Sequence, residues 1–169
     1  DGLGYMWVSD YSAACLYRVN IATRAIVGGP IGVGANPSCV LWDGAEHIYS
    51  ADFSSAQVSR VNRVTLAVDS AVAVAAGPYG LALDANGSIW VASKTVPRLE
   101  RINVATGLST GNVATAGGYF VASDRAGRIH GRPPAPQTRR STGTRAAATV
   151  PSGLRRRVAC CASQASTGG

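Results

Sequence analysis

Apolar and polar residues alternate along several short stretches of the chain, with turn-forming residues between them. Residues 81–83, 89–91 and 99–102 show this alternation most clearly, and a period of two is typical of β-strands with one buried face. The run from Asp84 to Gly87 reads Asp-Ala-Asn-Gly, and its Asn and Gly tolerate the positive φ of a tight hairpin. The pattern predicts antiparallel strands at 79–83, 88–93, 98–103 and 110–115.

The same pattern recurs at a nearly constant interval. Segments 36–52, 77–93 and 117–130 read NPSCVLWDGAEHIYSAD, GPYGLALDANGSIWVAS and GGYFVASDRAGRIH. When they are aligned, four aspartates share one column: Asp1, Asp43, Asp84 and Asp124. A four-stranded antiparallel sheet repeated at this period is the signature of a β-propeller blade, which buries its face against the next blade. We therefore expect an all-β fold, with about three four-stranded blades over residues 1–130.

Three further columns indicate how each blade is built. The third strand ends in Asn-x-x-Thr, and Asn and Thr side chains bond nearby backbone groups, so this pair predicts the turn into the fourth strand. The column of Trp7, Tyr49 and Trp90 is expected in the core between blades. Three arginines, 42 and then 41 residues apart, are expected to form hydrogen bonds between neighbouring blades: Arg18, Arg60 and Arg101.

Counting the strands indicates an incomplete ring. The chain opens with strands two to four of one blade, continues with two full blades, and ends with the first strand and a stub of the second strand of another. Closed propellers have roughly four to eight blades. Either the natural protein is longer, or chains associate so that residues 119–123 of one supply the missing inner strand of another, which closes a ring of about six blades.

The repeat stops after residue 130. Of the 39 residues at 131–169, 32 are Ala, Arg, Thr, Gly, Ser or Pro, and none is aromatic. Such a segment buries too little apolar surface to offset its ordering entropy, so we expect a disordered tail. Its seven arginines account for the whole net charge of +7, because residues 1–130 hold nine basic and nine acidic side chains.

An out-of-frame reading of a GC-rich gene also explains the composition of residues 131–169. A phosphate-binding arm is less favoured because stacking aromatics are missing, so nucleic acid is not an expected partner.

The repeat GPYGLALDANGSIWVAS followed by LERINVATG resembles the repeat of streptogramin lyases and related NHL-repeat propellers. The resemblance covers residues 1 to about 130. It implies that ligands meet one rim of the ring, at the loops that enter each inner strand and those between the second and third strands. The candidate ligand-binding residues on these loops are Asp10, Tyr11, Asp52, Phe53, Tyr79, Lys94 and Tyr119. The alternative is that they only form turns and cover blade edges.

Streptogramin lyases, as the resemblance implies, use a catalytic histidine and a magnesium ion held by acidic and histidine side chains. This chain has only His47 and His130. His47 is expected on the opposite face of the blades, in a solvated turn pair with Glu46, and His130 stands where the repeat holds an aromatic residue. We therefore assign no catalytic residue, metal ligand or cofactor, with magnesium reserved for a lyase alternative.

The four cysteines lack the spacing of a zinc site. Cys15 and Cys39 are expected to be two buried thiols, with a disulfide in an oxidising compartment as the alternative. No apolar run approaches the ~20 residues of a membrane span.

These observations favour a non-catalytic propeller segment that binds a small polar ligand or a protein at its mouth. We expect it to come from an exported, extracytoplasmic protein of bacterial type. The alternative is a fragment of a metal-dependent lyase or hydrolase whose catalytic blades lie outside this chain.

Overall fold

The computed structural model describes residues 1–103, 105–115, 120–124 and 126–131. These residues form four antiparallel sheets and no helix. Blade 1 comprises β1 (Tyr5–Asp10), β2 (Cys15–Asn20) and β3 (Ile26–Gly32). Blade 2 comprises β4 (Pro37–Trp42), β5 (His47–Asp52), β6 (Gln57–Asn62) and β7 (Val68–Ala73). Blade 3 comprises β8 (Pro78–Leu83), β9 (Ser88–Ser93), β10 (Arg98–Asn103) and β11 (Ser109–Ala114). Blade 4 comprises β12 (Val121–Ser123) and β13 (Ile129–Gly131).

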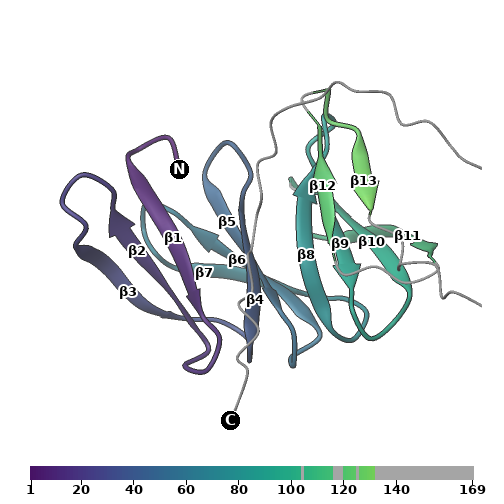
Figure 1. Ribbon diagram of the computed structural model, residues 1–169, viewed down its shortest axis with the longest axis horizontal. Helices are drawn as coiled ribbons and strands as arrows, with labels where there is room; N and C mark the ends of the chain where they lie inside the picture. Colours follow the sequence, from purple (N-terminus) through teal and green to yellow (C-terminus); the bar gives the residue numbers. More distant parts are fainter. Residues whose placement is uncertain (104, 116–119, 125, 132–169) are drawn as a thin grey trace, which may run out of the picture. The chain divides into compact units, whose positions relative to one another are not determined.

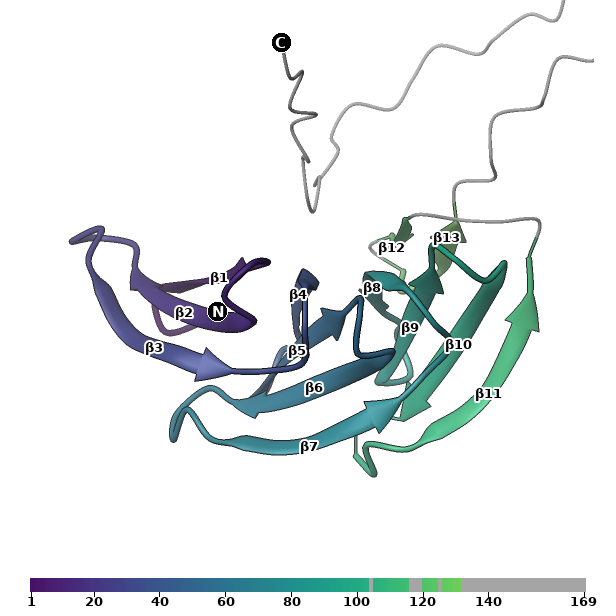
Figure 2. The same cartoon turned by 90° about the horizontal axis from the view of Figure 1, so that it is seen from below.

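Each blade is a meander in which consecutive strands pair (Figure 1). Seen from below, the blades follow one another with β4, β8 and β12 on the inner side and β3, β7 and β11 on the outer side (Figure 2). The predicted all-β fold is confirmed, and so is the division into three strands, two full blades and a two-stranded sheet. Apart from Gly131, the expected disordered tail at 131–169 lies outside the described residues.

The core lies between blades. Leu16 and Ile31 of blade 1 pack with Ile48 and Val61 of blade 2. Tyr49 and Val58 of blade 2 pack in the same way with Ile89 and Val91 of blade 3, among others. The aromatic column was predicted correctly, because Trp7 packs against the cluster between blades 1 and 2, and Trp90 packs against a cluster between blades 3 and 4. Cys15 and Cys39 are both buried, as expected.

The aspartate column builds the turn between the first two strands of each blade. In all four copies Oδ1 accepts the backbone N–H groups two and four residues later. Oδ2 of Asp1 and Asp84 accepts the indole N–H of the tryptophan six residues later, at 3.0 and 2.9 Å. In blade 4 the Arg128 N–H and guanidinium donate to Asp124 and hold the pKa of this carboxyl well below its usual range. Each aspartate side chain therefore provides a hydrogen-bond acceptor for turn N–H groups that have no backbone acceptor in the hairpin.

The Asn-x-x-Thr turns form as predicted. Oδ1 of each asparagine accepts the N–H groups two and three residues later. The blade 2 turn docks on blade 1, where Arg18 Nη1 donates to the Arg63 carbonyl at 2.9 Å. This confirms the expected hydrogen bond between blades for Arg18. Arg60 lies beside His47 of its own blade and close to Gly107 in the blade 3 turn, and Arg101 donates to Ser88 of its own blade.

Candidate functional site

Three blades contribute aromatic side chains to one rim of the described sheets. Phe53 follows β5, Tyr79 is the second residue of β8, and Phe120 precedes β12. The ring centroids of Phe53 and Tyr79 are 6.2 Å apart at an interplanar angle of 84°, and those of Tyr79 and Phe120 are 5.6 Å apart at 74°. Both pairs have the edge-to-face geometry that aromatic quadrupoles favour. We call these three residues, together with Lys94, the rim cluster.

Lys94 places a positive charge above two of these rings. Its Nζ lies 5.2 Å from the centroid of Tyr79 and 5.8 Å from that of Phe53, which is within cation–π range. Its backbone N–H donates to the Gly77 carbonyl at 2.7 Å and thereby fixes the loop between β9 and β10. Lys94 is exposed, and Phe120 retains 38% of its accessible surface. The cluster therefore offers a cation and apolar ring surface to a partner at the same place.

The structure brings together three of the seven rim candidates, namely Phe53, Tyr79 and Lys94. Tyr119 lies outside the described residues. Sequence reasoning missed Phe120, because it occupies the repeat column of Cys39 and Gly80, which points to no rim role. The appearance of an aromatic residue in that column was the signal that could have identified it.

Asp10 ends β1, and Tyr11 begins the turn between β1 and β2. Asp10 Oδ1 accepts the N–H groups of Ser12 and Ala13, at 3.1 and 2.9 Å. The Tyr11 carbonyl accepts a hydrogen bond from Asn36 Nδ2 at 3.1 Å, while the Tyr11 side chain is exposed. The Asn36 hydrogen bond thus connects the first turn of blade 1 with the linker that leads into blade 2.

Asp52 is fully buried. Ser50 Oγ donates to its Oδ1 at 2.7 Å, and Ser59 Oγ donates to its Oδ2 at 2.6 Å. The Gly34 N–H also donates to Oδ2, at 3.0 Å. The carboxylate thus anchors the linker between blades 1 and 2 beneath the rim, in contrast to the rim exposure expected from its repeat column.

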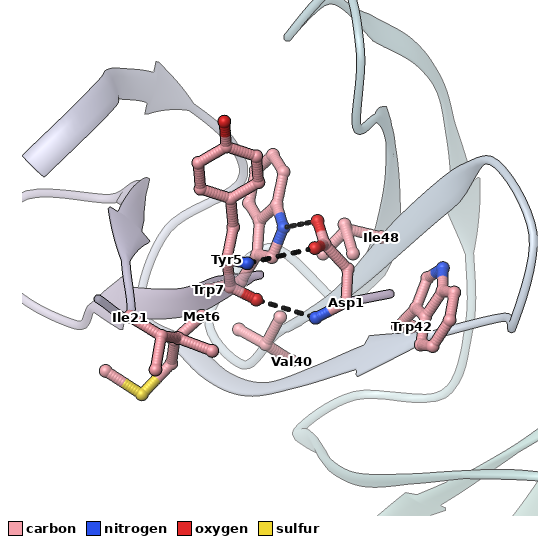
Figure 3. Close-up of a pocket in the computed structure, with 8 residues that line it drawn as sticks. All are labelled: Asp1, Tyr5, Met6, Trp7, Ile21, Val40, Trp42 and Ile48. Atoms are coloured by element: carbon pink, nitrogen blue, oxygen red, sulfur yellow. Dashed lines mark hydrogen bonds between the residues drawn. The ribbon is translucent and has the colours of Figure 1, made fainter. Parts of the chain in front are cut away.

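A pocket of about 390 Å³ lies between blades 1 and 2 (Figure 3). Its apolar wall comes from Trp7 on β1, Val40 and Trp42 on β4, and Ile48 on β5. The carboxylate of Asp1 also lines it, but this group already accepts the Trp7 indole N–H and the Tyr5 backbone N–H. Sequence reasoning did not anticipate this pocket.

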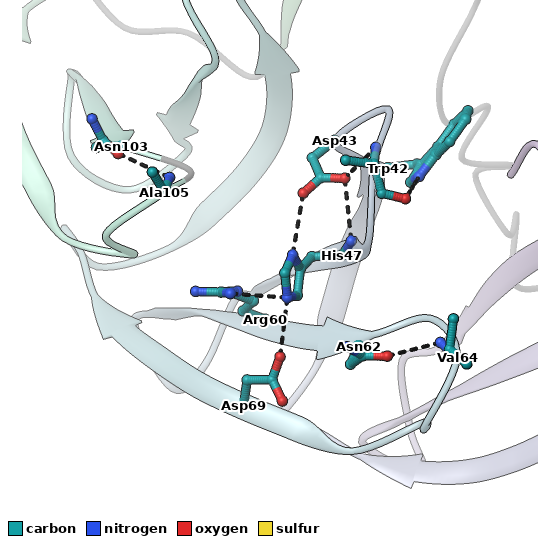
Figure 4. A network of polar contacts seen from close by, with 10 residues as sticks. Trp42, Asp43, His47, Arg60, Asn62, Val64, Asp69, Asn103 and Ala105 are labelled. Carbon is teal, nitrogen blue, oxygen red and sulfur yellow. Dashed lines mark hydrogen bonds and ion pairs between the residues drawn. The ribbon is translucent and has the colours of Figure 1, made fainter.

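His47 is held in a polar network at the opposite end of β5 from the rim (Figure 4). Its Nδ1 is 3.4 Å from Asp43 Oδ2, and its Nε2 is 2.9 Å from Arg60 Nη2 and 3.1 Å from Asp69 Oδ2. Only 14% of the side chain is accessible. The expected position opposite the rim is confirmed, but the expected solvated pair with Glu46 is wrong. The reason is that β5 directs the ring toward the aspartate turn and toward β6 and β7.

The neighbouring Tyr49 ring meets the His47 ring edge-on, with centroids 6.5 Å apart. Burial raises the pKa of Tyr49 to about 12. His130 is exposed, and its Nε2 lies 3.2 Å from Asp124 Oδ2, in the place that the tryptophan indole takes in blades 1 and 3. Within the part of the chain that the structure describes, no three His, Cys, Asp or Glu side chains are arranged to hold a metal ion. The same residues contain no helix long and apolar enough to cross a membrane.

Solved structures similar to this chain share its architecture. Hydrazine synthase of Kuenenia stuttgartiensis superimposes with a TM-score of 0.69 at 18% identity, covering 73% of this chain and 37% of that one. The WD40 β-propeller domain of Doa1 gives 0.66 at 11%, covering 76% and 43%, and the RRP9 WD40 repeats give 0.63 at 10%, covering 70% and 38%. The fold is that of a β-propeller. The chain spans less than half the length of these structures, and identities this low show the fold alone. No protein family profile and no curated protein matches the sequence.

Proposed function

We propose that this propeller segment is a binding scaffold that holds a partner at the rim cluster. The observation that carries the proposal is the position of Lys94 Nζ above the Phe53 and Tyr79 rings, with the exposed Phe120 ring beside them. Because three blades contribute to one small surface, a partner there contacts a rigid framework rather than a single loop. Sites of this composition suit a partner that carries a carboxylate next to an apolar or aromatic group.

The partner is a small polar ligand or a protein segment. A lone surface charge pair contributes little to affinity, typically about 0–1 kcal/mol. The aromatic rings must therefore provide most of the contact area, and Lys94 provides orientation. We further propose that the repeat is of the streptogramin-lyase and NHL type and that the protein acts outside the cytoplasm, on the basis of the repeat resemblance.

Backbone amide NMR of the full chain tests the rim, with the peptide acetyl-Glu-Trp-Glu-amide as the probe. We expect its addition to shift the amides of Phe53, Lys94 and Phe120. Lys94→Glu and Phe120→Ala should each reduce these shifts at the same peptide concentration, whereas Tyr11→Ala, at another exposed aromatic residue, should leave them unchanged. Shifts confined to other residues, or equal shifts in Lys94→Glu, would contradict the proposal.

The resemblance to streptogramin lyases also motivates a second proposal, that the parent protein is a metal-dependent lyase with catalytic blades outside this chain. The parent gene separates the two, because only the lyase needs further repeats that carry axial histidine and acidic residues. Incubating the full chain with magnesium and a cyclic depsipeptide, with the products followed by mass spectrometry, tests whether this chain itself is catalytic, and neither proposal expects turnover. Turnover that His47→Ala abolishes would overturn the binding scaffold.

A further inference from the structure

Asn86 is the only asparagine of the chain that a glycine follows. The other five precede isoleucine, proline, arginine or valine. A backbone nitrogen can attack the side-chain carbonyl carbon of the asparagine before it, and glycine hinders this attack least because it has no Cβ. Proline has no N–H and does not react in this way. Asn86 is therefore the asparagine whose neighbour best permits such a ring closure.

The structure leaves this pair of residues open to solvent. Asn86 and Gly87 are both exposed in the turn between β8 and β9. A Cβ atom on Gly87 would meet no atom within 4 Å, so a cyclic product has room there. None of the hydrogen bonds between described residues involves the side-chain amide of Asn86. By contrast, Oδ1 accepts two backbone N–H groups at each of Asn20, Asn62 and Asn103.

The turn restrains the attacking nitrogen only weakly. The Gly87 N–H donates to the Asp84 carbonyl at 3.2 Å, which is at the long end of the range for such bonds. This bond must break before the nitrogen can attack Asn86. Exposed turns open locally at a lower free-energy cost than core strands do. The folded chain therefore slows the reaction but leaves a route to it.

We propose that Asn86 is a site of spontaneous deamidation, and that the isoaspartate formed there weakens the hairpin of β8 and β9. The Gly87 nitrogen gives its proton to water and bonds to Asn86 Cγ. The Cγ–Nδ2 bond breaks, and the nitrogen takes up a proton from water and leaves as ammonia. Water then opens the cyclic imide at one of its two carbonyls, which yields aspartate or isoaspartate. One water is consumed and one ammonia released, with no oxidation or reduction.

Isoaspartate would disturb the hydrogen bonds that hold this turn. Asp84 Oδ1 accepts the N–H groups of Asn86 and Ser88, both at 2.9 Å. Isoaspartate adds one methylene to the main chain between these two N–H groups, so they lose the spacing at which one oxygen atom binds both. Ile89, the next residue, is fully buried in the core between blades 2 and 3. The change therefore reaches the packing between blades. The turn lies at the opposite end of β8 and β9 from the rim cluster, so the site is independent of it.

Peptide mapping of the full chain after incubation in mildly alkaline buffer tests the reaction. Cleavage after lysine and arginine gives peptide 64–94, with Asn86 as its only asparagine, and peptide 102–125, with Asn103 and Asn112. We expect a growing fraction of peptide 64–94 to gain about 1 Da, with isoaspartate among the products, and peptide 102–125 to stay unchanged. The gain should be slower in acidic buffer, because the attacking nitrogen must lose its proton. No gain in peptide 64–94, or an equal gain in peptide 102–125, would overturn the proposal.

Two variants at this exposed position separate the lengthened main chain from the added charge. Asn86→Asp carries the charge on an ordinary main chain, and Asn86→Ala has no amide to lose. Freshly prepared Asn86→Asp should unfold at nearly the same urea concentration as the fresh parent chain. The deamidated parent should unfold at a lower urea concentration, whereas Asn86→Ala incubated in the same way should keep its midpoint. An unchanged midpoint after deamidation of the parent, or an equal fall in Asn86→Ala, would overturn the effect on the hairpin.

Discussion

The Gly34 N–H donates to Asp52 Oδ2 at 3.0 Å, and one blade later the Ala75 N–H donates to Glu100 Oε1 at the same distance. Gly34 and Ala75 occupy equivalent places in the linkers between successive blades. Asp52 ends β5, however, whereas Glu100 lies in β10, where blade 2 has Ser59. The buried carboxylate that binds the linker therefore comes from the second strand of blade 2 and from the third strand of blade 3, and both blades retain the hydrogen bond.

Replacing Asp52 by alanine should be strongly destabilising. The substitution leaves the Gly34 N–H and the Ser59 hydroxyl without their buried acceptor, and we expect a loss of about 3 kcal/mol. Asp10→Ala is the matched control, since Asp10 shares the repeat column but accepts only local loop N–H groups. It should cost about 1 kcal/mol or less. Urea unfolding measures both losses, and equal losses would contradict the buried role of Asp52.

Gly87 has φ +71° in the turn between β8 and β9, as the predicted hairpin requires. A Cβ atom there would meet no atom within 4 Å, so we attribute the cost of Gly87→Val to backbone strain. We expect a loss of about 1–2 kcal/mol in the free energy of unfolding. Asn86→Val, at the exposed preceding residue, controls for introducing a β-branched side chain. Unchanged stability of Gly87→Val would contradict the turn geometry.

The fourth residue after the turn asparagine also has positive φ in each complete turn. It is Arg24 at 59°, Leu66 at 63° and Gly107 at 67°. Glycine adopts this conformation without strain, so Arg24→Gly should stabilise the chain by about 0.5–1 kcal/mol. Gly107→Ala should destabilise it by about 1 kcal/mol. Thermal or urea unfolding tests both signs, and destabilisation by Arg24→Gly would show that its side chain contributes more than the strain costs.

Asp84 should make the free energy of unfolding depend on pH in the acidic range. Burial opposes its ionised form, but hydrogen bonds from the Ser88 N–H, the Trp90 indole and the Asn86 N–H outweigh this and hold its pKa below the ordinary 3.8. A carboxyl with a lowered folded-state pKa contributes its full stability above the unfolded-state pKa and loses it as pH falls toward the folded-state value. We therefore expect unfolding free energy to decrease as pH falls below about 4.

Asp84→Asn tests the assignment. The amide oxygen can still accept the turn N–H groups, so the variant should lose only about 1–2 kcal/mol at neutral pH. Its free energy of unfolding should then change less than that of the parent chain between pH 7 and pH 3. Glu46→Gln, at an exposed carboxylate, is the control and should retain the parent dependence. An unchanged acid dependence in Asp84→Asn would rule out Asp84 as a source.

Strand positions and turns could be predicted because short-range interactions encode them. The alternation around Ile89 and Val91 sets a strand, and the Asp84 and Asn103 side chains bond backbone groups only two to four residues away. A constant period then implies that one sheet packs on the next. The all-β blades and the strand count therefore followed from the residues alone.

Contacts between residues far apart in the sequence could not be predicted from the columns of the aligned repeat. Asp10 and Asp52 share a column, yet Asp10 is partly exposed at the end of β1 and Asp52 is fully buried, because different neighbours cover them. His47 was expected in solvent, and the fold encloses it between Asp43 and Asp69. The rim cluster and the pocket beside β1 arise where several blades meet. Local sequence determines how each strand forms, whereas the packing of blades determines which side chains are buried and which remain accessible to a partner.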